Sequence, residues 1–236
     1  LLATYDASDV ATQQKWRTHA QRLRLATSGS AALPARLAES WRALAGAIPL
    51  ERYGMTEIGI ALSNPLAPEA RQFGAVGRPL PTVEIRLVTG GDDRPADTHE
   101  LWVRGPSVFA GYLDRPEATA EAFADGWFRT GDLVATTKDG ALRIVGRIST
   151  DILKSAGHKL SALEIEEVMR EHPAVLEVAV VGLPDEALGD RVVAAVVPAP
   201  GAPPPEALAA WLALRLSRPK QPRQIFYLPA LPRNAM

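Results

Sequence analysis

The spacing of apolar residues differs between successive regions of this 236-residue chain, and these differences limit the folds that it can adopt. Residues 12–24 and 34–45 carry apolar side chains at helical spacing, and short apolar segments follow at 23–26 and 48–53. From about residue 83 to 145, apolar and polar residues instead alternate in short segments flanked by Gly, Pro or Asp. The first pattern predicts an alternating α/β layer, and the second predicts a β-rich subdomain.

The last third of the chain predicts a small α+β unit. Residues 161–164 have the form of a helix-capping box, and Ile165, Val168 and Met169 supply an apolar stripe behind it. The other predicted elements are strands at 175–181 and 192–197, a proline-rich link at 198–205, a helix bearing Leu208, Trp211, Leu212 and Leu216, and a strand at 224–228. The boundary with the preceding part is predicted near residue 146.

The composition argues against several classes of function. Lys and Arg number 26 against 27 Asp and Glu, which gives no electrostatic reason to expect nucleic acid or an acidic membrane as a partner. No apolar run approaches the ~20 residues that span a bilayer, and nothing indicates a protein partner. The absence of Cys excludes disulfides and thiolate sites, and four His without close pairing do not support a zinc site. Because a chain without Cys suits a reducing compartment, we expect a cytoplasmic protein.

Residues 53–57, Tyr-Gly-Met-Thr-Glu, follow a predicted strand and combine groups that suit a magnesium nucleotide. An aromatic ring can stack on a purine, a hydroxyl can bond phosphate oxygens, and a carboxylate can hold Mg²⁺. Considered without the rest of the chain, the same five residues are more often an ordinary turn at a strand end.

Further short segments in a fixed order reverse that interpretation. They are 28–33 (SGSAAL), 100–105 (ELWVRG), 111–112 (GY), 127–133 (WFRTGDL), 146–147 (GR), 157–159 (GHK) and 164–166 (EIE). Together with residues 53–57 they resemble the adenylate-forming superfamily of acyl-CoA synthetases, peptide-synthetase adenylation domains and luciferases, over essentially the whole chain. The resemblance implies ATP, Mg²⁺ and coenzyme A as ligands.

The resemblance also implies a set of nucleotide-binding residues. They are Ser30, Ala31, Ala32, Tyr53, Gly54, Met55, Thr56, Asp132 and Arg147. Residues 30–32 and the ring of Tyr53 would enclose adenine, Thr56 would contact the α-phosphate, and Glu57 would hold Mg²⁺. Thr56 and Glu57 are thus the implied catalytic residues. The alternative for residues 30–32 is a plain turn between a strand and a helix.

Two further residues are implied at the ribose. A carboxylate offers two acceptor oxygens, so Asp132 suits the two ribose hydroxyls, whereas the structural alternative for residues 130–132 is a turn that ends a strand. Arg147 would reach the same ribose, and its alternative is a surface ion pair at a domain junction.

The resemblance places a hinge just after Arg147, about which a C-terminal domain rotates between the two half-reactions. We predict Ser149 as its pivot, because β-branched Thr150 is stiffer, and the alternative is an ordered loop. Ser155, Ala156 and Gly157 would line the pantetheine tunnel. Related sequences often have Gly where Ala156 stands and an aromatic residue where His158 stands, so this chain departs from the pattern at both positions.

The spacing of residues 146–154, one residue longer than in most relatives, is similar to that of malonyl-CoA synthetases, as are the residues on either side of 53–57. The implied substrate is a small carboxylic acid, malonate or methylmalonate. A second carboxylate cannot be buried unpaired without a cost of several kcal/mol. Arg52 could meet it with a two-pronged bond, so we hypothesise that Arg52 selects dicarboxylic acids. The alternative is an exposed arginine at a strand end.

The implied organisation has three parts. Residues 1–146 would form the C-terminal part of the large AMP-binding domain, 147–151 the hinge, and 152–236 the small, truncated C-terminal domain. Overall we expect an α/β layer with a β-rich subdomain, followed by a small mobile α+β domain.

Two segments that the family needs are expected outside this chain. They are a phosphate-binding loop ending in Pro-Lys, and a lysine two residues beyond Met236. We therefore expect the chain by itself to be inactive in forming acyl-AMP. Because the chain starts at Leu-Leu-Ala, a targeting peptide of a longer parent would not be visible. The alternatives are a peptide-synthetase adenylation domain, which the hinge spacing disfavours, and a non-catalytic nucleotide or CoA binder.

Overall fold

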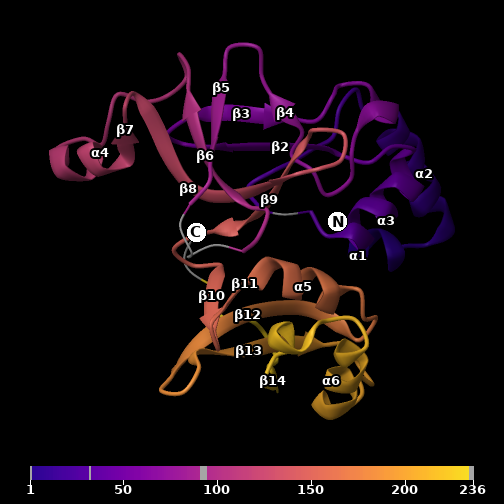
Figure 1. Cartoon of the computed structure of the whole chain (residues 1–236). Coiled ribbons are helices and arrows are strands. Elements are labelled where there is room, and N and C mark those ends of the chain that lie inside the picture. The colour runs from indigo at the N-terminus through magenta and orange to yellow at the C-terminus, as the bar shows by residue number, and fades with distance from the viewer. Residues whose placement is uncertain (1, 32, 91–94, 234–236) are drawn as a thin grey trace. The chain divides into compact units, whose positions relative to one another are not determined.

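The computed structural model describes residues 2–31, 33–90 and 95–233 (Figure 1). Its contacts divide the chain into two compact units, which are described separately. Unit 1 comprises the described residues of Leu1–Leu87, Leu101–Thr130 and Ala135–Ile144, and unit 2 comprises those of Val88–Glu100, Gly131–Val134 and Val145–Met236. The division runs through four strands, β5 (Glu84–Val88), β6 (His99–Arg104), β8 (Trp127–Thr136) and β9 (Leu142–Arg147).

Unit 1 begins with helices and a four-stranded sheet. The helices are α1 (Leu2–Asp6), α2 (Val10–Gln21) and α3 (Ala35–Ala45), and the strands, in sheet order, are β1 (Thr27–Ser28), β2 (Leu50–Met55), β3 (Gly59–Ser63) and β4 (Arg78–Pro79). β1 and β2 are parallel and α3 connects them, whereas the other pairs are antiparallel. The helix α3 buries Ala38 and Leu44 and ends at Gly46, whose φ of 89° suits a glycine. A short 3₁₀ helix, η1 (Pro68–Ala70), follows β3.

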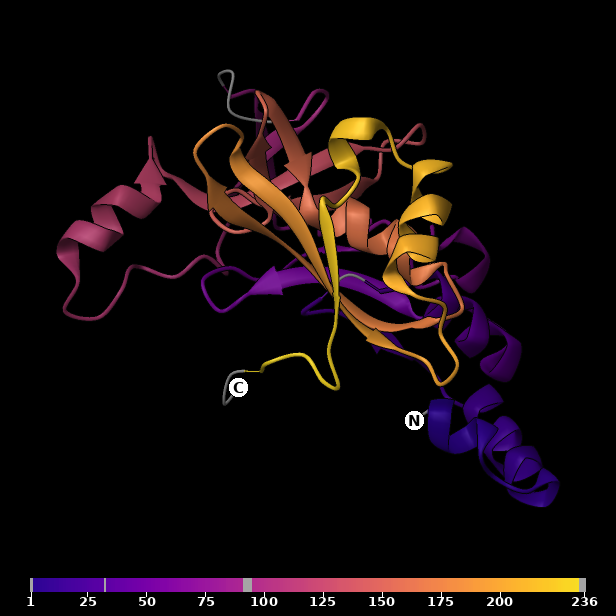
Figure 2. The ribbon, with the colours of Figure 1, turned by 90° about the horizontal axis from the view of Figure 1, so that it is seen from below.

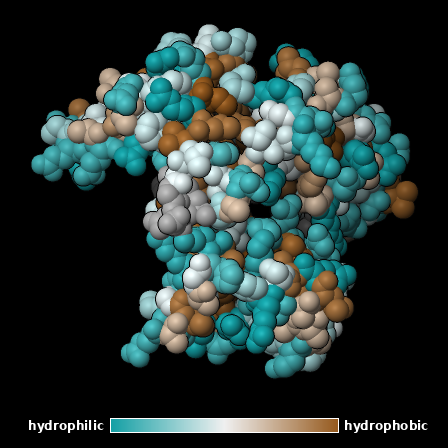
Figure 3. All heavy atoms as spheres, in the orientation of Figure 1, coloured by the Kyte–Doolittle hydropathy of each residue, from teal (hydrophilic) through white to brown (hydrophobic). Residues whose placement is uncertain are grey.

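The second sheet has the order β5 (Glu84–Val88), β6, β8, β7 (Phe123–Ala124), and β9 pairs with β8. Along β6 the side chains of Leu101 and Val103 are buried and Arg104 is exposed, as an alternating strand requires. Arg104 bonds Glu84 on β5, and this hydrogen bond lowers the pKa of the Glu84 carboxyl. The helix α4 (Pro116–Ala122) precedes β7, and Figure 3 shows that this projecting segment is mostly hydrophilic on the face in view.

Unit 2 contains a third sheet with helices packed on it. Its elements are β10 (Ile152–Ser155), β11 (His158–Ser161), α5 (Ala162–Arg170), β12 (Val175–Asp185), β13 (Gly189–Pro198), α6 (Pro205–Ala213), η2 (Arg218–Lys220) and β14 (Gln224–Tyr227). The sheet order is β11-β10-β13-β12, and β14 pairs with β13 in parallel. Figures 1 and 2 show α5 along β12 and α6 beside β14. Ile165, Met169, Leu208 and Leu212 are buried in the core between them.

The predicted fold class is confirmed, but one of the predicted strands lies at different residues. Helices and sheets form the expected mixed α/β architecture. The predicted helix start at Ser161 is confirmed, because Ser161 Oγ accepts a hydrogen bond from Glu164 N at 3.1 Å. The Glu164 carboxylate pairs with Lys220, so the hydrogen bonds of the described residues show only the serine half of the predicted capping box. The predicted strand at 23–26 is wrong: only Thr27–Ser28 pairs with β2, and Leu23 and Leu25 are exposed. The division into compact units does not test the predicted boundary at residues 146–147, which stays a prediction.

Among the helices of the described residues, the longest is α2, with 12 residues. None of these helices combines the length and the apolar character that crossing a bilayer requires.

Candidate functional site

The segment predicted to bind nucleotide lies where β2 turns into β3. Tyr53, Gly54 and Met55 are half-buried residues at the end of β2, Thr56 is exposed in the turn, and Glu57 is half-buried. A register shift between Tyr53 and Gly54 marks a bulge at this point. The sequence therefore places one hydroxyl and one carboxylate in a tight turn at a strand end.

Gly54 has a steric role that the sequence did not reveal. Its φ is not positive, but a Cβ there would lie 2.1 Å from the carbonyl oxygen of Gly59 and 2.9 Å from Cα of Ile60. These are backbone atoms, which cannot move aside as the end of a side chain can. Gly54 is thus required because β3 passes too close for any side chain.

Glu57 is held by a segment that precedes α4. Phe109 N donates to the Glu57 carbonyl oxygen at 2.8 Å, and the Tyr112 hydroxyl donates to Glu57 Oε1 at 3.0 Å. The sequence analysis noted Gly111 and Tyr112 as part of the family resemblance but gave Tyr112 no role. The Gly-Tyr pair at 111–112 was visible in the sequence. That Tyr112 bonds Glu57, 55 residues away, is known only from the fold.

The loop after β1 runs beside the end of β2. Ser28 pairs with Glu51 in the parallel register, so the residues that follow Ser28 leave the sheet at the same edge as Arg52 and Tyr53. Ser30 has a φ of 72°, and Ser30 and Ala31 are exposed. Ala32 lies outside the described residues. The loop after β1 and the end of β2 thus lie at the same sheet edge, and their enclosure of adenine stays a prediction.

Arg52 lies beneath this loop. It is half-buried, and a Cβ on Gly29 would come within 3.1 Å of Arg52 Nη1 and 3.2 Å of its Cζ. Among the described residues, the Arg52 guanidinium has no hydrogen bond or ion pair. Because neighbours in a strand point to opposite faces, Arg52 and Tyr53 do not share a face of β2.

In unit 2, Asp132 and Arg147 are brought together by the pairing of β8 with β9. Arg147 Nε lies 3.1 Å from Asp132 Oδ1, and Arg147 Nη2 lies 3.3 Å from Asp132 Oδ2. Asp132 is 5% exposed, whereas the Arg147 side chain is 44% exposed. The two predicted ribose contacts therefore form a two-pronged ion pair with each other, with the carboxylate inside and the guanidinium at the surface.

The predicted hinge is a tight turn organised by Asp151. The Asp151 carboxylate accepts from Arg147 N at 2.8 Å, and Asp151 N donates back to Arg147 O at 2.8 Å. Ser149 is exposed, and its N–H makes no backbone hydrogen bond to a described residue. Sequence reasoning named Ser149 but did not foresee the anchoring by Asp151.

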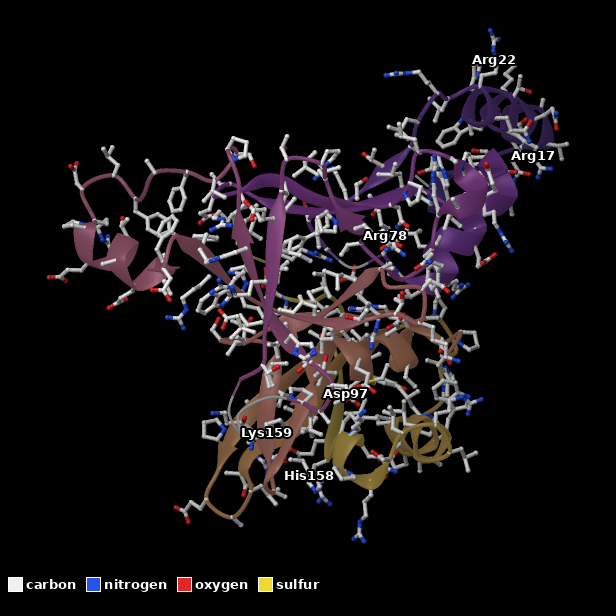
Figure 4. All side chains as sticks on the ribbon, turned by 45° about the horizontal axis from the view of Figure 1, so that its top comes forward. Arg17, Arg22, Arg78, Asp97, His158 and Lys159 are labelled. Carbon is white, nitrogen blue, oxygen red and sulfur yellow. The ribbon has the colours of Figure 1, made fainter. Side chains whose placement is uncertain are left out.

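The predicted tunnel residues form the turn of the β10–β11 hairpin. Ser155 pairs with His158, so Ala156 and Gly157 are a two-residue loop with φ of 49° and 78°. Ala156 N donates to Leu188 O at 2.8 Å, and Lys154 N donates to Asp190 Oδ2 at 2.7 Å. The loop before β13 therefore supports this turn. His158 and Lys159 continue from it along β11 (Figure 4).

Glu57 is the carboxylate of the predicted site that could help to hold Mg²⁺. No group of three or more His, Asp or Glu side chains that could hold a metal occurs among the described residues. Mg²⁺ is commonly bound through one or two carboxylates together with substrate phosphates and water. Glu57, a lone carboxylate in an open turn, fits that mode and not a cage built from protein alone.

The chain matches two family models. Residues 2–113 match the family model described as AMP-binding enzyme, and residues 164–236 match the AMP-binding enzyme C-terminal domain. The chain is 46% identical over 239 residues to the mitochondrial malonate–CoA ligase of Mus musculus, covering 92% of this chain and 41% of that protein. The chain thus spans about two fifths of that relative's length.

Two solved structures are similar. The ATP-bound MatB of Rhodopseudomonas palustris has a TM-score of 0.83 at 38% identity, covering 90% of this chain and 43% of that one. A malonyl-CoA ligase in a product complex with methylmalonyl-CoA and AMP has a TM-score of 0.56 at 46% identity, covering 98% of this chain and 50% of that one. With two family models matching its two ends and relatives of this identity, the chain belongs to the AMP-binding enzyme family.

Proposed function

We propose that the protein containing this chain joins malonate, or its methyl derivative, to coenzyme A at the expense of ATP. The acid carboxylate attacks the α-phosphate of ATP, which forms acyl-AMP and releases pyrophosphate. The CoA thiol then attacks the acyl carbonyl and AMP leaves. The observation that carries the proposal is the turn of Tyr53, Thr56 and Glu57 at the sheet edge, in a chain whose relatives are named malonate–CoA ligases.

In this proposal, several of the predicted site residues contact ATP. Tyr53 and residues 30–32 bind adenine, Thr56 contacts the α-phosphate, and Asp132 and Arg147 bind the ribose. Mg²⁺, held by Glu57, would neutralise phosphate charge. Support comes from the ion pair with Arg147, which holds the Asp132 carboxylate in a fixed direction. Each carboxylate oxygen can accept a second hydrogen bond, so the pair with Arg147 leaves acceptor capacity for the ribose hydroxyls.

Arg52 is our candidate for recognising the second carboxylate of the acid. A guanidinium that is half-buried and without an ion pair among the described residues is free to bind an anion. Gly29 supports this role, because a side chain there would press on the Arg52 guanidinium. A monocarboxylic acid would leave Arg52 unpaired, which makes the site selective.

The first prediction tests Arg52 in the full-length protein, with ATP–pyrophosphate exchange measured for malonate, methylmalonate, acetate and a fatty acid. For Arg52→Ala we expect kcat/KM for malonate to fall about 10- to 100-fold, since a hydrogen-bonded charge contributes ~1.5–3 kcal/mol. Acetate should change little. Arg36→Ala, at an exposed position on α3, is the matched control. An unchanged kcat/KM for malonate would refute the role of Arg52.

Pyrophosphate exchange, combined with assays of the acyl acceptor and of ligand binding, separates the two alternative functions. A peptide-synthetase adenylation domain would show exchange but would pass the acyl group to a carrier-protein arm and not to CoA. A binding module would bind AMP or CoA calorimetrically without any acid-dependent exchange. Either result would replace the proposed function.

The compartment is a separate proposal. The sequence leads us to propose a cytoplasmic protein, whereas the name of the mouse relative places that protein in mitochondria. Cell fractionation with an antibody against the native protein distinguishes the two locations.

A further inference from the structure

We propose that Tyr112 is a positioning residue that orients the Glu57 carboxylate for its metal ion. This inference rests on the proposed function, in which Glu57 holds Mg²⁺. Its direct basis is the hydrogen bond of 3.0 Å from the Tyr112 hydroxyl to Glu57 Oε1. Both residues belong to unit 1.

The hydrogen bond involves only one of the two oxygens of the Glu57 carboxylate. Glu57 Oε1 accepts from Tyr112, whereas Glu57 Oε2 has no hydrogen bond from a described residue. A carboxylate fixed through one oxygen presents the other in a defined direction. Mg²⁺ demands near-ideal octahedral geometry, so the direction of a ligand oxygen matters more for it than for a larger cation.

Two further hydrogen bonds join the segment that carries Tyr112 to the turn that carries Glu57. Ser107 Oγ donates to the carbonyl oxygen of Ile58 at 2.8 Å, and Phe109 N donates to the carbonyl oxygen of Glu57 at 2.8 Å. The segment that carries Tyr112 is thereby attached to the turn that carries Glu57 at three points. Three hydrogen bonds between the same two segments hold Tyr112 and Glu57 near each other, so their contact does not depend on two surface side chains alone.

Tyr112 itself is held from the other side. Tyr112 N donates to Thr119 Oγ1 at 2.9 Å, and its ring packs edge-on against Phe109 with centroids 4.8 Å apart. Gly111 permits this approach, since a Cβ there would lie 2.6 Å from Thr119 Cγ2. The Phe109 contact and the Thr119 hydrogen bond thus restrain Tyr112, whose side chain is partly exposed, and Tyr112→Phe removes the hydroxyl while it keeps the ring.

The test is metal binding by Tyr112→Phe in the full-length protein. Mn²⁺ is titrated by electron paramagnetic resonance in the presence of a non-hydrolysable ATP analogue. We expect the Kd for Mn²⁺ to rise about 10-fold, the lower end of the range seen when a group that orients a metal ligand is removed. The melting temperature should stay close to that of the native protein, because the ring remains.

Tyr227→Phe is the matched control. Its hydroxyl donates to Pro203 O at 2.7 Å in unit 2, so this variant also loses one tyrosine hydrogen bond but none to a proposed ligand. It should bind Mn²⁺ as the native protein does. If Tyr112→Phe binds Mn²⁺ with unchanged or higher affinity, the positioning role is overturned.

A variant cycle separates positioning from a general structural effect. In a Glu57→Gln background, adding Tyr112→Phe should change the Kd for Mn²⁺ by less than about twofold, because the hydroxyl acts through the carboxylate. An equal loss in both backgrounds would overturn the proposal, including the case in which Tyr112→Phe is partly unfolded. Failure of the proposed function shows separately, as native protein that performs no acid-dependent pyrophosphate exchange.

Discussion

Single residues in this chain are constrained by what passes beside them. Gly54 and Gly111 resemble ordinary flexible positions in the sequence, but each is required by a close neighbour, the Gly59 carbonyl oxygen and the Thr119 side chain. Asp132 shows the same dependence, because its two oxygens are occupied by Arg147. The type of a residue indicates its chemistry. Which substitutions it tolerates, and which partners its polar atoms bind, depend on the neighbours that the fold brings to it.

Gly54→Ala tests this constraint. We expect the variant to be destabilised by about 1–3 kcal/mol, the usual cost of inserting atoms into a filled space. Because the β2–β3 turn must shift, nucleotide binding should weaken as well. Urea denaturation and titration with an ATP analogue measure the two effects.

Gly46→Ala is the comparison for that variant. Its added Cβ meets nothing within 4 Å, so only the φ of 89° opposes it. It should lose stability without losing nucleotide affinity. Native stability and native affinity in Gly54→Ala would contradict the steric argument.

Among the elements, the β10–β11 hairpin shows how a fold accommodates an unfavourable residue. Ala156 has a φ of 49°, a left-handed conformation that costs a non-glycine residue roughly 1–2 kcal/mol. Hydrogen bonds from Ala156 N to Leu188 O and from Lys154 N to Asp190 hold the turn in place. The hydrogen bonds to Leu188 and Asp190 thus hold the β10–β11 turn in place, although the positive φ of Ala156 is unfavourable.

Ala156→Gly should relieve that strain. We expect the free energy of unfolding to rise by about 0.5 kcal/mol, since the relief is partly offset by the greater freedom of glycine in the unfolded chain. Ala187→Gly, at a position without a positive φ, should instead lower stability. Thermal unfolding of both variants checks the signs, and a less stable Ala156→Gly would refute the strain argument.

For the molecule as a whole, we propose that the two half-reactions involve rotation about the turn after Arg147, as the family resemblance implies. Asp151 fixes one end of this turn through its carboxylate, and Ile148 N donates to Gly131 O at 2.9 Å at the other. Ser149 lies between them, exposed and without a backbone hydrogen bond from its N–H to a described residue. This supports the proposal that Ser149 is the pivot.

Ser149→Pro tests the pivot in the full-length protein. Proline fixes φ near −65°, so a rotation that needs another φ is blocked. We expect pyrophosphate exchange to stay within about threefold, while thioester formation falls about 10-fold or more. Ser149→Ala should retain both half-reactions. Equal losses in the two half-reactions of Ser149→Pro would show that the variant damages the site and not a movement.

The fold class, the start of helix α5 and the family were predictable from the sequence, because they depend on local spacing and on motifs in a fixed order. The family resemblance also pointed to Glu57, Asp132 and Arg147. The folded chain was needed to show that Tyr112 bonds Glu57, that Asp132 and Arg147 pair, and that the first strand is Thr27–Ser28 and not residues 23–26. The reason is physical: a partner distant in sequence is chosen by strand register and by the space that neighbours leave, which no local pattern specifies.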